Sequence, residues 1–185
     1  MSSREAADGR LSSREAAYRN PVEFAPVDWL DPRAVALRAA MDAETGAMYA
    51  DFVASLDPAV AAKSARALVI DPATIAVTVL ALQDGAPVGH AALRPYGAEF
   101  EVKKLFVAPD ARGTAAARGL MTWLEEFAIQ QGAASLVLQT GPRQIAAIAL
   151  YERLGYHPIP PYGLYVDMVD ARCYRKVLGG EPVIP

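Results

Sequence analysis

Residues 107–120 of the chain read Val-Ala-Pro-Asp-Ala-Arg-Gly-Thr-Ala-Ala-Ala-Arg-Gly-Leu. An apolar strand pattern ends at Val107, a loop of small residues follows, and a helical pattern begins at Thr114. The first turn of a helix has free main-chain N–H groups and the positive end of the helix dipole. Small side chains let an anion approach those groups, and Arg112 adds a cation. The stretch therefore predicts a phosphate or pyrophosphate site, with a plain surface loop as the alternative.

Strand and helix patterns alternate on both sides of this loop. Apolar and β-branched runs predict strands over 22–27, 75–83, 88–94, 100–107, 135–139 and 172–177. Helical spacing predicts helices over 32–44, 58–67, 114–131 and 143–154. Asp31-Pro32 and Asp57-Pro58 start the first two helices, and Thr45-Gly46 is expected to end the first.

This order of elements indicates an α/β (α+β) protein. The three adjacent strands over 75–107 favour an antiparallel meander, and the later strand–helix–strand favours a parallel crossover. We therefore expect a mixed central sheet with helices on both faces. The 185 residues suit one domain, over 21–178, between tails at 1–20 and 179–185. The first tail repeats Ser-Ser-Arg-Glu-Ala-Ala at 2–7 and 12–17, which is too short and polar to bury a core.

Composition excludes several classes of function. With a formal net charge of −3 and no basic block, nucleic acid is not an expected partner. No apolar run is long enough to span a membrane, and charged residues interrupt the N-terminus, so we expect neither a membrane anchor nor a signal peptide and place the protein in the cytoplasm. The single cysteine, Cys173, excludes an internal disulfide, and His90 and His157 have no metal-ligand spacing, so no metal is expected.

Several stretches of the sequence resemble the GCN5-related N-acetyltransferase (GNAT) family. Residues 112–117, Arg-Gly-Thr-Ala-Ala-Ala, resemble its motif A, Arg/Gln-x-x-Gly-x-Gly/Ala. Residues 101–107 and 139–141 resemble its fourth strand and the end of the following strand, and 150–156 resemble its Leu-Tyr-x-x-x-Gly-Phe/Tyr segment. The likeness covers 22–178, with specific motifs in 101–156. Ala115 replaces the usual Gly: its methyl group would crowd a pyrophosphate or oppose a positive φ, but fits freely if the position is already helical.

The resemblance implies how acetyl-CoA would be held. In this family the fourth and fifth strands form a splayed pair after a bulge, and the pantetheine arm lies between them. The backbone of the fourth strand would pair with that arm, here through Leu105, Phe106 and Val107. The pyrophosphate would lie on the loop formed by Arg112, Gly113, Thr114, Ala115, Ala116 and Ala117.

Acetyl transfer to an amine needs a base and an acid, because an alkylammonium with a pKa of about 10.4 must lose a proton and a thiolate must gain one. The resemblance places Glu101 as the base, with Glu99 a weaker candidate; alternatively Glu101 is an exposed carboxylate paired with Lys103 or a neighbour. Tyr151 matches the acid, or is a half-buried aromatic residue. The acceptor pocket would be lined by Tyr49, Phe52, Tyr162 and Tyr165, each of which could instead serve packing alone.

The sequence thus predicts an N-acetyltransferase that moves an acetyl group from acetyl-CoA to a primary amine of a small molecule or peptide. One alternative is a non-catalytic acyl-CoA-binding or regulatory module of the same fold. Another is a protein-interaction domain. A Rossmann nucleotide-binding protein is disfavoured because no Gly-x-Gly-x-x-Gly follows an early strand. By analogy with the family, a homodimer is also expected.

Overall fold

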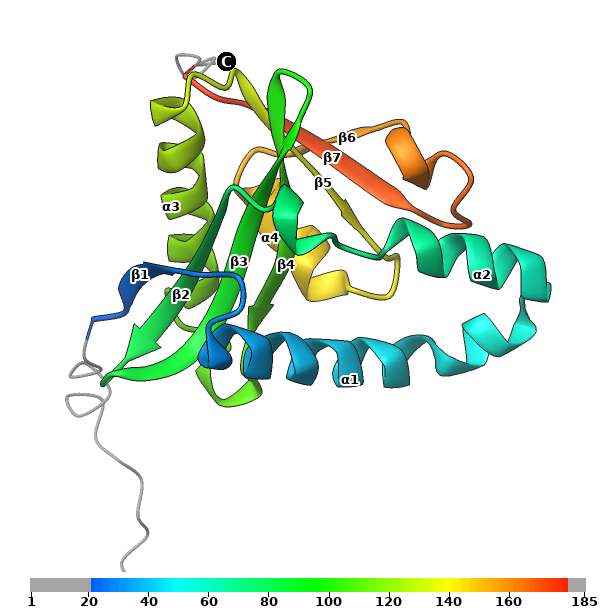
Figure 1. Ribbon diagram of the computed structural model, residues 1–185, viewed down its shortest axis with the longest axis horizontal. Helices are drawn as coiled ribbons and strands as arrows, with labels where there is room; N and C mark the ends of the chain where they lie inside the picture. Colours follow the sequence, from blue (N-terminus) through cyan, green and yellow to red (C-terminus); the bar gives the residue numbers. More distant parts are fainter. Residues whose placement is uncertain (1–20, 180–185) are drawn as a thin grey trace, which may run out of the picture.

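The computed structural model describes residues 21–179, and one open sheet forms its centre (Figure 1). Its seven strands lie in the order β1 (Glu23–Val27), β2 (Val77–Gln83), β3 (Ala86–Tyr96), β4 (Glu99–Val107), β5 (Ser135–Thr140), β7 (Arg172–Val177) and β6 (His157–Ile159). All neighbours are antiparallel except β4 and β5, which run parallel. The expected meander and crossover in a mixed sheet are confirmed.

Four α-helices cover the two faces of this sheet. They are α1 (Pro32–Ser55), α2 (Pro58–Ala67), α3 (Ala116–Gln130) and α4 (Ile145–Arg153), and short 3₁₀ turns are η2 (Pro72–Thr74), η3 (Pro109–Ala111) and η4 (Gly163–Tyr165). The α3 side holds the main core, where Val79 and Ala81 of β2 meet Leu120 and Leu124 of α3. Leu80, between them in sequence, points to the other face. This alternation, with period two, buries both faces of the strand.

The predicted end of the first helix at Thr45-Gly46 is wrong. The helix α1 continues as one element of 24 residues to Ser55, and Leu56 then adopts an extended conformation. Glycine costs about 1 kcal/mol in a helix interior, which the surrounding alanine, methionine and glutamate residues offset. The predicted starts are confirmed, since Asp31 and Asp57 accept the N–H groups of Arg33 and Ala59.

The short strand β6 was not expected, because Pro158 lies in its middle. It is an edge strand that pairs only with β7, and proline is tolerated there. None of the helices within residues 21–179 is long and apolar enough to cross a membrane. The predicted tails at 1–20 and 179–185 lie outside the described residues, apart from Gly179, so the domain limits stay predictions.

A bulge in β4 opens the sheet, as the resemblance implied. Lys104 has a φ of 53°, and the pairing of β3 with β4 shifts register between His90 and Ala92. β4 pairs with β5 only from Phe100 to Val102, so the two strands separate beyond Val102. The splayed strand pair is therefore confirmed, and the edge of β4 after the bulge is free on the side of β5.

A buried polar network supports this bulge. His90 is fully buried, with Nδ1 at 2.9 Å from the carbonyl oxygen of Lys104 and Nε2 at 3.1 Å from Nη1 of Arg38. The carbonyl can only accept and the guanidinium only donate, so Nδ1 carries the proton and the ring is neutral. Arg38 also donates to the carbonyl of Trp29 and stacks on its indole ring. The network thus connects α1 to the carbonyl of the residue with positive φ.

Candidate active site

A cavity of about 590 Å³ lies where β4, the start of α3 and α4 converge. It brings together most of the residues predicted for the cofactor: Leu105, Phe106, Val107, Arg112, Gly113, Thr114 and Ala117. Side chains that were not predicted complete its wall: Glu44, Met48, Ala111, Arg118, Arg143, Gln144, Ile145, Ala146, Ala147, Leu150 and Arg153. We call this space the groove.

The loop at the start of α3 has the conformation that an anion site needs. Gly113 has a φ of 75°, which favours glycine, and leads the chain into the helix. Ala115 is already helical, with φ −72° and ψ −7°, so its methyl group is not strained there. The amides of Ala115, Ala117 and Arg118 belong to the first turn, which has no intrahelical acceptors for them. They supply donors at the positive end of the helix dipole.

Ala116 contributes to this loop in a different way. It is fully buried, and its N–H lies 3.2 Å from the hydroxyl oxygen of Thr114. Thr114 in turn donates to the carbonyl of Ala111 at 2.6 Å. Ala116 therefore fixes the shape of the loop rather than lining the groove.

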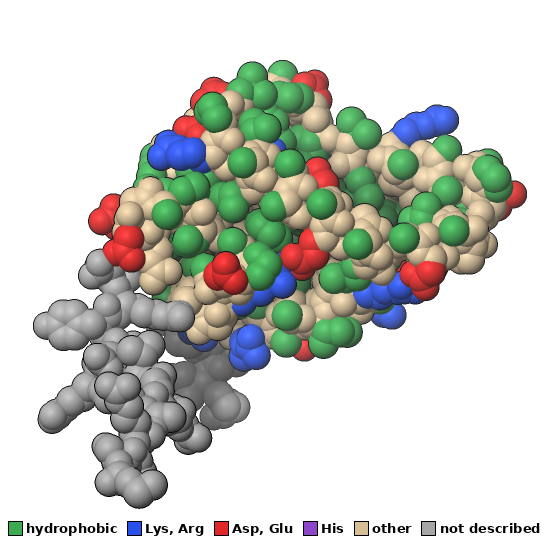
Figure 2. Space-filling model, turned by 90° about the horizontal axis from the view of Figure 1, so that it is seen from below, with side chains coloured by type: hydrophobic (Ala, Val, Ile, Leu, Met, Phe, Trp, Pro, Cys, Tyr) green, Lys and Arg blue, Asp and Glu red, His purple; other side chains and the backbone are tan. Residues whose placement is uncertain are grey.

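Acidic side chains of α1 pair with basic side chains near the groove. Figure 2 shows acidic and basic groups lying next to one another on the face seen from below. Three pairs at 2.5 to 2.6 Å join α1 to the rest of the protein: Asp42 with Lys104, Glu44 with Arg112 and Asp51 with Arg143. Arg112 also donates through Nε to the carbonyl of Val107 at 3.1 Å. Its cation thus lies against β4, beside the anion loop.

A second cavity of about 410 Å³ lies between the sheet and the helices α1 and α2. Tyr49 and Phe52 line it, as predicted, together with apolar groups such as Met41, Leu56 and Ile70. Its charged lining groups are Asp42, Lys103, Lys104 and Asp170. Its apolar wall suits a ligand with an apolar body, and we call it the acceptor pocket.

The two cavities meet at the β4 bulge. Gln144 lines both of them, while Lys104 lines the acceptor pocket and its neighbour Leu105 lines the groove. Tyr49 closes the same place from α1, because its hydroxyl accepts the N–H of Arg143 at 2.9 Å. Gly141 lies so close to the Tyr49 hydroxyl that any side chain there would overlap it. A group transferred from one cavity to the other would pass this point.

Tyr162 and Tyr165 do not line the acceptor pocket, although sequence reasoning placed them there. Instead, their hydroxyl groups donate to Oε1 of Glu101, at 3.1 Å and 2.6 Å. Burial raises the pKa of both phenols, and the nearby carboxylate raises it further, so both stay protonated as donors.

Glu101 is fully enclosed rather than an exposed strand carboxylate. Its side chain has 0% exposure and lines neither cavity. Oε2 accepts from Nε of Arg94 at 2.6 Å, and Nζ of Lys103 lies 3.3 Å from Oε1. Glu99, the weaker candidate, pairs with Arg175 at 2.8 Å and also hydrogen-bonds to Ser135. The role of Glu101 as the base stays a prediction.

Tyr151 lies in the main core beside the groove. It is 6% exposed, and its ring contacts those of Tyr156 and Tyr174. Its neighbour Leu150 lines the groove, but Tyr151 is not among the lining residues. Burial raises the pKa of its phenol, which keeps the proton that an acid needs. Its role as the acid also stays a prediction.

Comparison with known proteins shows which family the chain belongs to. The model of the acetyltransferase (GNAT) family matches residues 37–156, which include α1, both cavities and the loop before α3. The chain belongs to the GNAT acetyltransferase family. An IAA acetyltransferase of Azospirillum brasilense is 39% identical over 77 residues, or 42% of this chain. The match spans 50% of that curated relative's length.

Solved GNAT structures share the fold along their whole length. A protein from Klebsiella pneumoniae assigned as an acyl-CoA N-acyltransferase is 26% identical, with a TM-score of 0.68 over 85% of this chain and 97% of that one. The PaiA N-acetyltransferase of Thermoplasma acidophilum, solved with coenzyme A, is 13% identical, with a TM-score of 0.59 over 85% of this chain and 99% of that one. At that identity the likeness concerns the fold alone.

The groove fits coenzyme A on the evidence of this chain's own residues. The free edge of β4 offers backbone groups to an extended chain, and the start of α3 offers amides to a diphosphate. The sequence missed Lys103, Lys104, Arg143 and Gln144, which the fold brings to the two cavities. Adjacent lysines in a strand expected to be central were the available signal, because a buried charge there needs a partner.

Proposed function

We propose that this GNAT protein is an N-acetyltransferase that uses acetyl-CoA and acts on a primary amine of a small molecule or short peptide. One observation carries the proposal: a groove suited to coenzyme A and a largely apolar pocket meet at the β4 bulge, between Lys104 and Leu105. Acetyl-CoA supplies the activated acetyl thioester when bound. The amides of α3 and the edge of β4 hold it, and the acceptor pocket orients the amine.

The apolar lining of the pocket favours an amine with an apolar body. We therefore choose 2-phenylethylamine as the first acceptor to test, because its aromatic ring can pack on Tyr49 and Phe52. A panel of other primary amines and short peptides with a free N-terminus completes the set. Release of free thiol from acetyl-CoA measures transfer. Dependence of that release on the amine supports the proposal.

Arg112→Glu tests the binding of coenzyme A separately from the transfer of the acetyl group. An anion beside the start of α3 is expected to weaken coenzyme A binding at least tenfold, which corresponds to about 1.4 kcal/mol. Calorimetry with coenzyme A measures this directly. Unchanged affinity would show that Arg112 does not contribute to coenzyme A binding.

A non-catalytic acyl-CoA-binding module is the second candidate. The complete enclosure of Glu101, which leaves that carboxylate without a direct route to an acceptor, favours it. This candidate predicts a higher melting temperature with coenzyme A but no thiol release with any amine. A ligand at 100 times its Kd stabilises a protein by about 2.7 kcal/mol, so melting would detect binding.

We further propose that the protein acts in the cytoplasm, without nucleic acid or membrane, and as a homodimer. The net charge of −3, and the mixture of acidic and basic groups on the face seen in Figure 2, support the absence of a nucleic-acid partner. The dimer rests on analogy with the family. Light scattering on the purified protein, with and without coenzyme A, tests it.

A further inference from the structure

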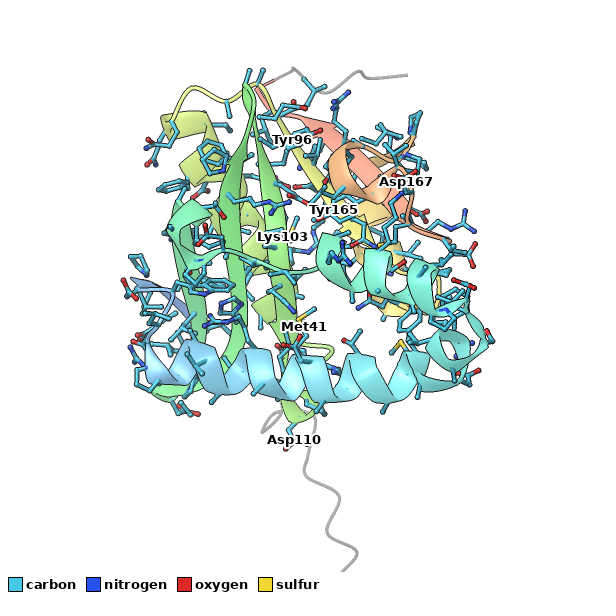
Figure 3. The ribbon with its side chains drawn as sticks, turned by 45° about the vertical axis from the view of Figure 1, so that its right-hand side comes forward. Met41, Tyr96, Lys103, Asp110, Tyr165 and Asp167 are labelled. Atoms are coloured by element: carbon cyan, nitrogen blue, oxygen red, sulfur yellow. The ribbon has the colours of Figure 1, made fainter. Side chains whose placement is uncertain are left out.

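Lys103 is the basic group that lies between the buried carboxylate and the acceptor pocket. Its side chain is 8% exposed, and it lines the pocket that Glu101 does not reach. Figure 3 shows Lys103 of β4 and Met41 of α1 on the sides of the same space, with Tyr165 close to Lys103. A molecule in the pocket therefore meets the amine of Lys103 before any other part of this cluster.

The hydrogen bonds of Glu101 leave it no role as a direct base. Arg94 donates to Oε2, while Tyr162, Tyr165 and Lys103 surround Oε1. Oε1 meets three of these donors and Oε2 one, and the carboxylate lines neither cavity. Glu101 can act on the pocket only through one of these partners.

Tyr165 connects Glu101 to Lys103. Its hydroxyl oxygen lies 2.6 Å from Oε1 of Glu101 and 2.6 Å from Nζ of Lys103. The carboxylate can only accept, so the phenol donates to it and accepts from Lys103. A neutral Lys103 has two N–H groups, which meet Tyr165 and Glu101, and one lone pair left for the pocket.

The charges of the cluster favour this neutral form. Arg94 and Glu101 already form a buried ion pair, so a second cation would be uncompensated. Burial lowers the pKa of Lys103, and the carboxylate of Glu101 opposes part of that shift. The other titratable or charged groups around it are Tyr162 and Tyr165 near η4, Cys173 of β7, Lys104 of β4, Asp42 of α1 and Asp170.

We propose that Lys103 takes the proton from the acceptor amine, with Glu101 and Tyr165 as positioning residues behind it. The proposal rests on the proposed function. The acceptor ammonium gives one proton to the neutral Lys103, and its nitrogen lone pair then forms a bond to the acetyl carbon. The bond from that carbon to sulfur breaks with its electron pair on sulfur. The second proton of the nitrogen goes to the thiolate, and Lys103 returns its proton to solvent.

The first experiment measures the titration of Lys103 and needs no acceptor. The chain has only four lysines: Lys63, Lys103, Lys104 and Lys176. NMR of the full chain with ¹³C-labelled lysine resolves them, and Lys103→Met and Lys104→Arg assign the signals. We expect Lys103 to titrate below the ordinary pKa of a lysine, because burial lowers its pKa. An ordinary lysine pKa at Lys103 overturns the inference.

The second experiment separates a base from a structural cation. Lys103→Arg supplies the charge and donors that a structural cation would provide but cannot accept a proton, whereas Lys103→Met removes the amine. With 2-phenylethylamine and acetyl-CoA, kcat is expected to fall about a hundredfold or more in both variants. The KM of the amine should change little. For Lys103→Met the loss should shrink toward pH 10, where the acceptor itself becomes neutral.

Lys63→Arg is the control, because Lys63 is an exposed lysine that pairs with Asp167 at 2.7 Å and lines neither cavity. It should keep nearly full kcat. Full kcat in Lys103→Arg, or a change confined to the amine KM, overturns the inference and leaves the proposed function intact. No transfer by the wild-type protein to any amine overturns both. Coenzyme A binding and the melting temperature report the folding of each variant, and if Lys103→Met does not fold, the NMR titration and Lys103→Arg decide.

Discussion

The guanidinium of Arg112 lies 2.6 Å from Oε2 of Glu44, and both side chains line the groove. This contact joins α1, which forms one wall of the acceptor pocket, to the loop that suits a diphosphate. A cation that is shared with Glu44 is less available to a phosphate. Binding of coenzyme A is therefore expected to compete with this ion pair.

Glu44→Gln should strengthen coenzyme A binding by up to about fivefold, because a partly exposed ion pair is worth at most about 1 kcal/mol. Calorimetry at low salt measures the change. Asp167→Asn is the control, since it breaks an exposed pair with Lys63 that touches neither cavity. Weaker binding in Glu44→Gln would mean that Glu44 positions Arg112 for the ligand.

Ala115→Gly should leave coenzyme A affinity unchanged. Position 115 is already helical, so restoring the glycine typical of the family relieves no strain. Ala115 is the N-cap residue of α3, where glycine is at least as well tolerated as alanine, so the stability should change by no more than a few tenths of a kcal/mol. Chemical denaturation and calorimetry measure both quantities. A clear gain in affinity would show that the methyl group obstructs the diphosphate.

Gly141→Ala should raise the KM of the acceptor amine several-fold, with little change in coenzyme A affinity. A methyl group at this position would push the Tyr49 ring out of the acceptor pocket and break its hydrogen bond with Arg143. Gly46→Ala also adds a methyl group to the lining of the acceptor pocket, but nothing lies within 4 Å of it; it is the size control and should stabilise the protein by about 0.5 to 1 kcal/mol. Steady-state kinetics and melting distinguish the two; an unchanged KM in Gly141→Ala would exclude Tyr49 from acceptor binding.

His90 should make the protein less stable in mild acid. Burial lowers its pKa from 6.5 to about 4, so the unfolded chain binds an extra proton between these values. The free energy of unfolding should therefore fall as the pH drops from 6.5 to 4, by up to about 3 kcal/mol. Carboxylates also titrate in this window, so the test is the difference between the wild-type protein and His90→Gln. Parallel pH profiles for the two would contradict a neutral, buried His90.

Tyr151→Phe should lower kcat more than it weakens coenzyme A binding, if the phenol relays the second proton of the nitrogen to the leaving thiolate. Burial raises the pKa of this phenol, so it stays protonated at neutral pH but is a weaker acid than an ordinary tyrosine. Tyr174→Phe, whose ring contacts Tyr151, is the matched control. Thiol release and calorimetry measure the two effects. Equal losses, or none, would leave Tyr151 with a structural role.

Local patterns were enough to predict the elements and the anion loop. Asp-Pro pairs start α1 and α2, and the small residues before α3 form the expected turn with a positive φ at Gly113. The end of α1 could not be predicted locally, because the residues around Gly46 favour a helix more strongly than one glycine opposes it.

The acceptor pocket is built from residues far apart in the sequence. For this reason only Tyr49 and Phe52, of the four residues predicted to line it, were placed correctly. Tyr49 and Phe52 lie in the part of α1 beyond Gly46. Because the helix was predicted to end at Thr45-Gly46, the helical spacing that puts these two side chains on one face was not recognised. Tyr165 donates a hydrogen bond to Glu101, which lies 64 positions away in the sequence, and no local periodicity predicts such a contact. Glu101 and Lys103 do share one side of β4, which alternation indicates, but the donors that enclose the carboxylate come from β3 and η4.

The helix α1 is unbroken, but it is buried in the core only at its beginning. Its buried residues, Ala34, Leu37 and Arg38, all lie near its first turns, whereas the later turns border the acceptor pocket. A helix of 24 residues is about 36 Å long, so a tilt of about 5° at the fixed end moves the far end by about 3 Å. Tyr49 and Asp51, on these later turns, are both tied to Arg143, so a tilt of this kind would first have to break those two contacts. The width of the cavity is thus set by a few polar contacts at the end of one long helix.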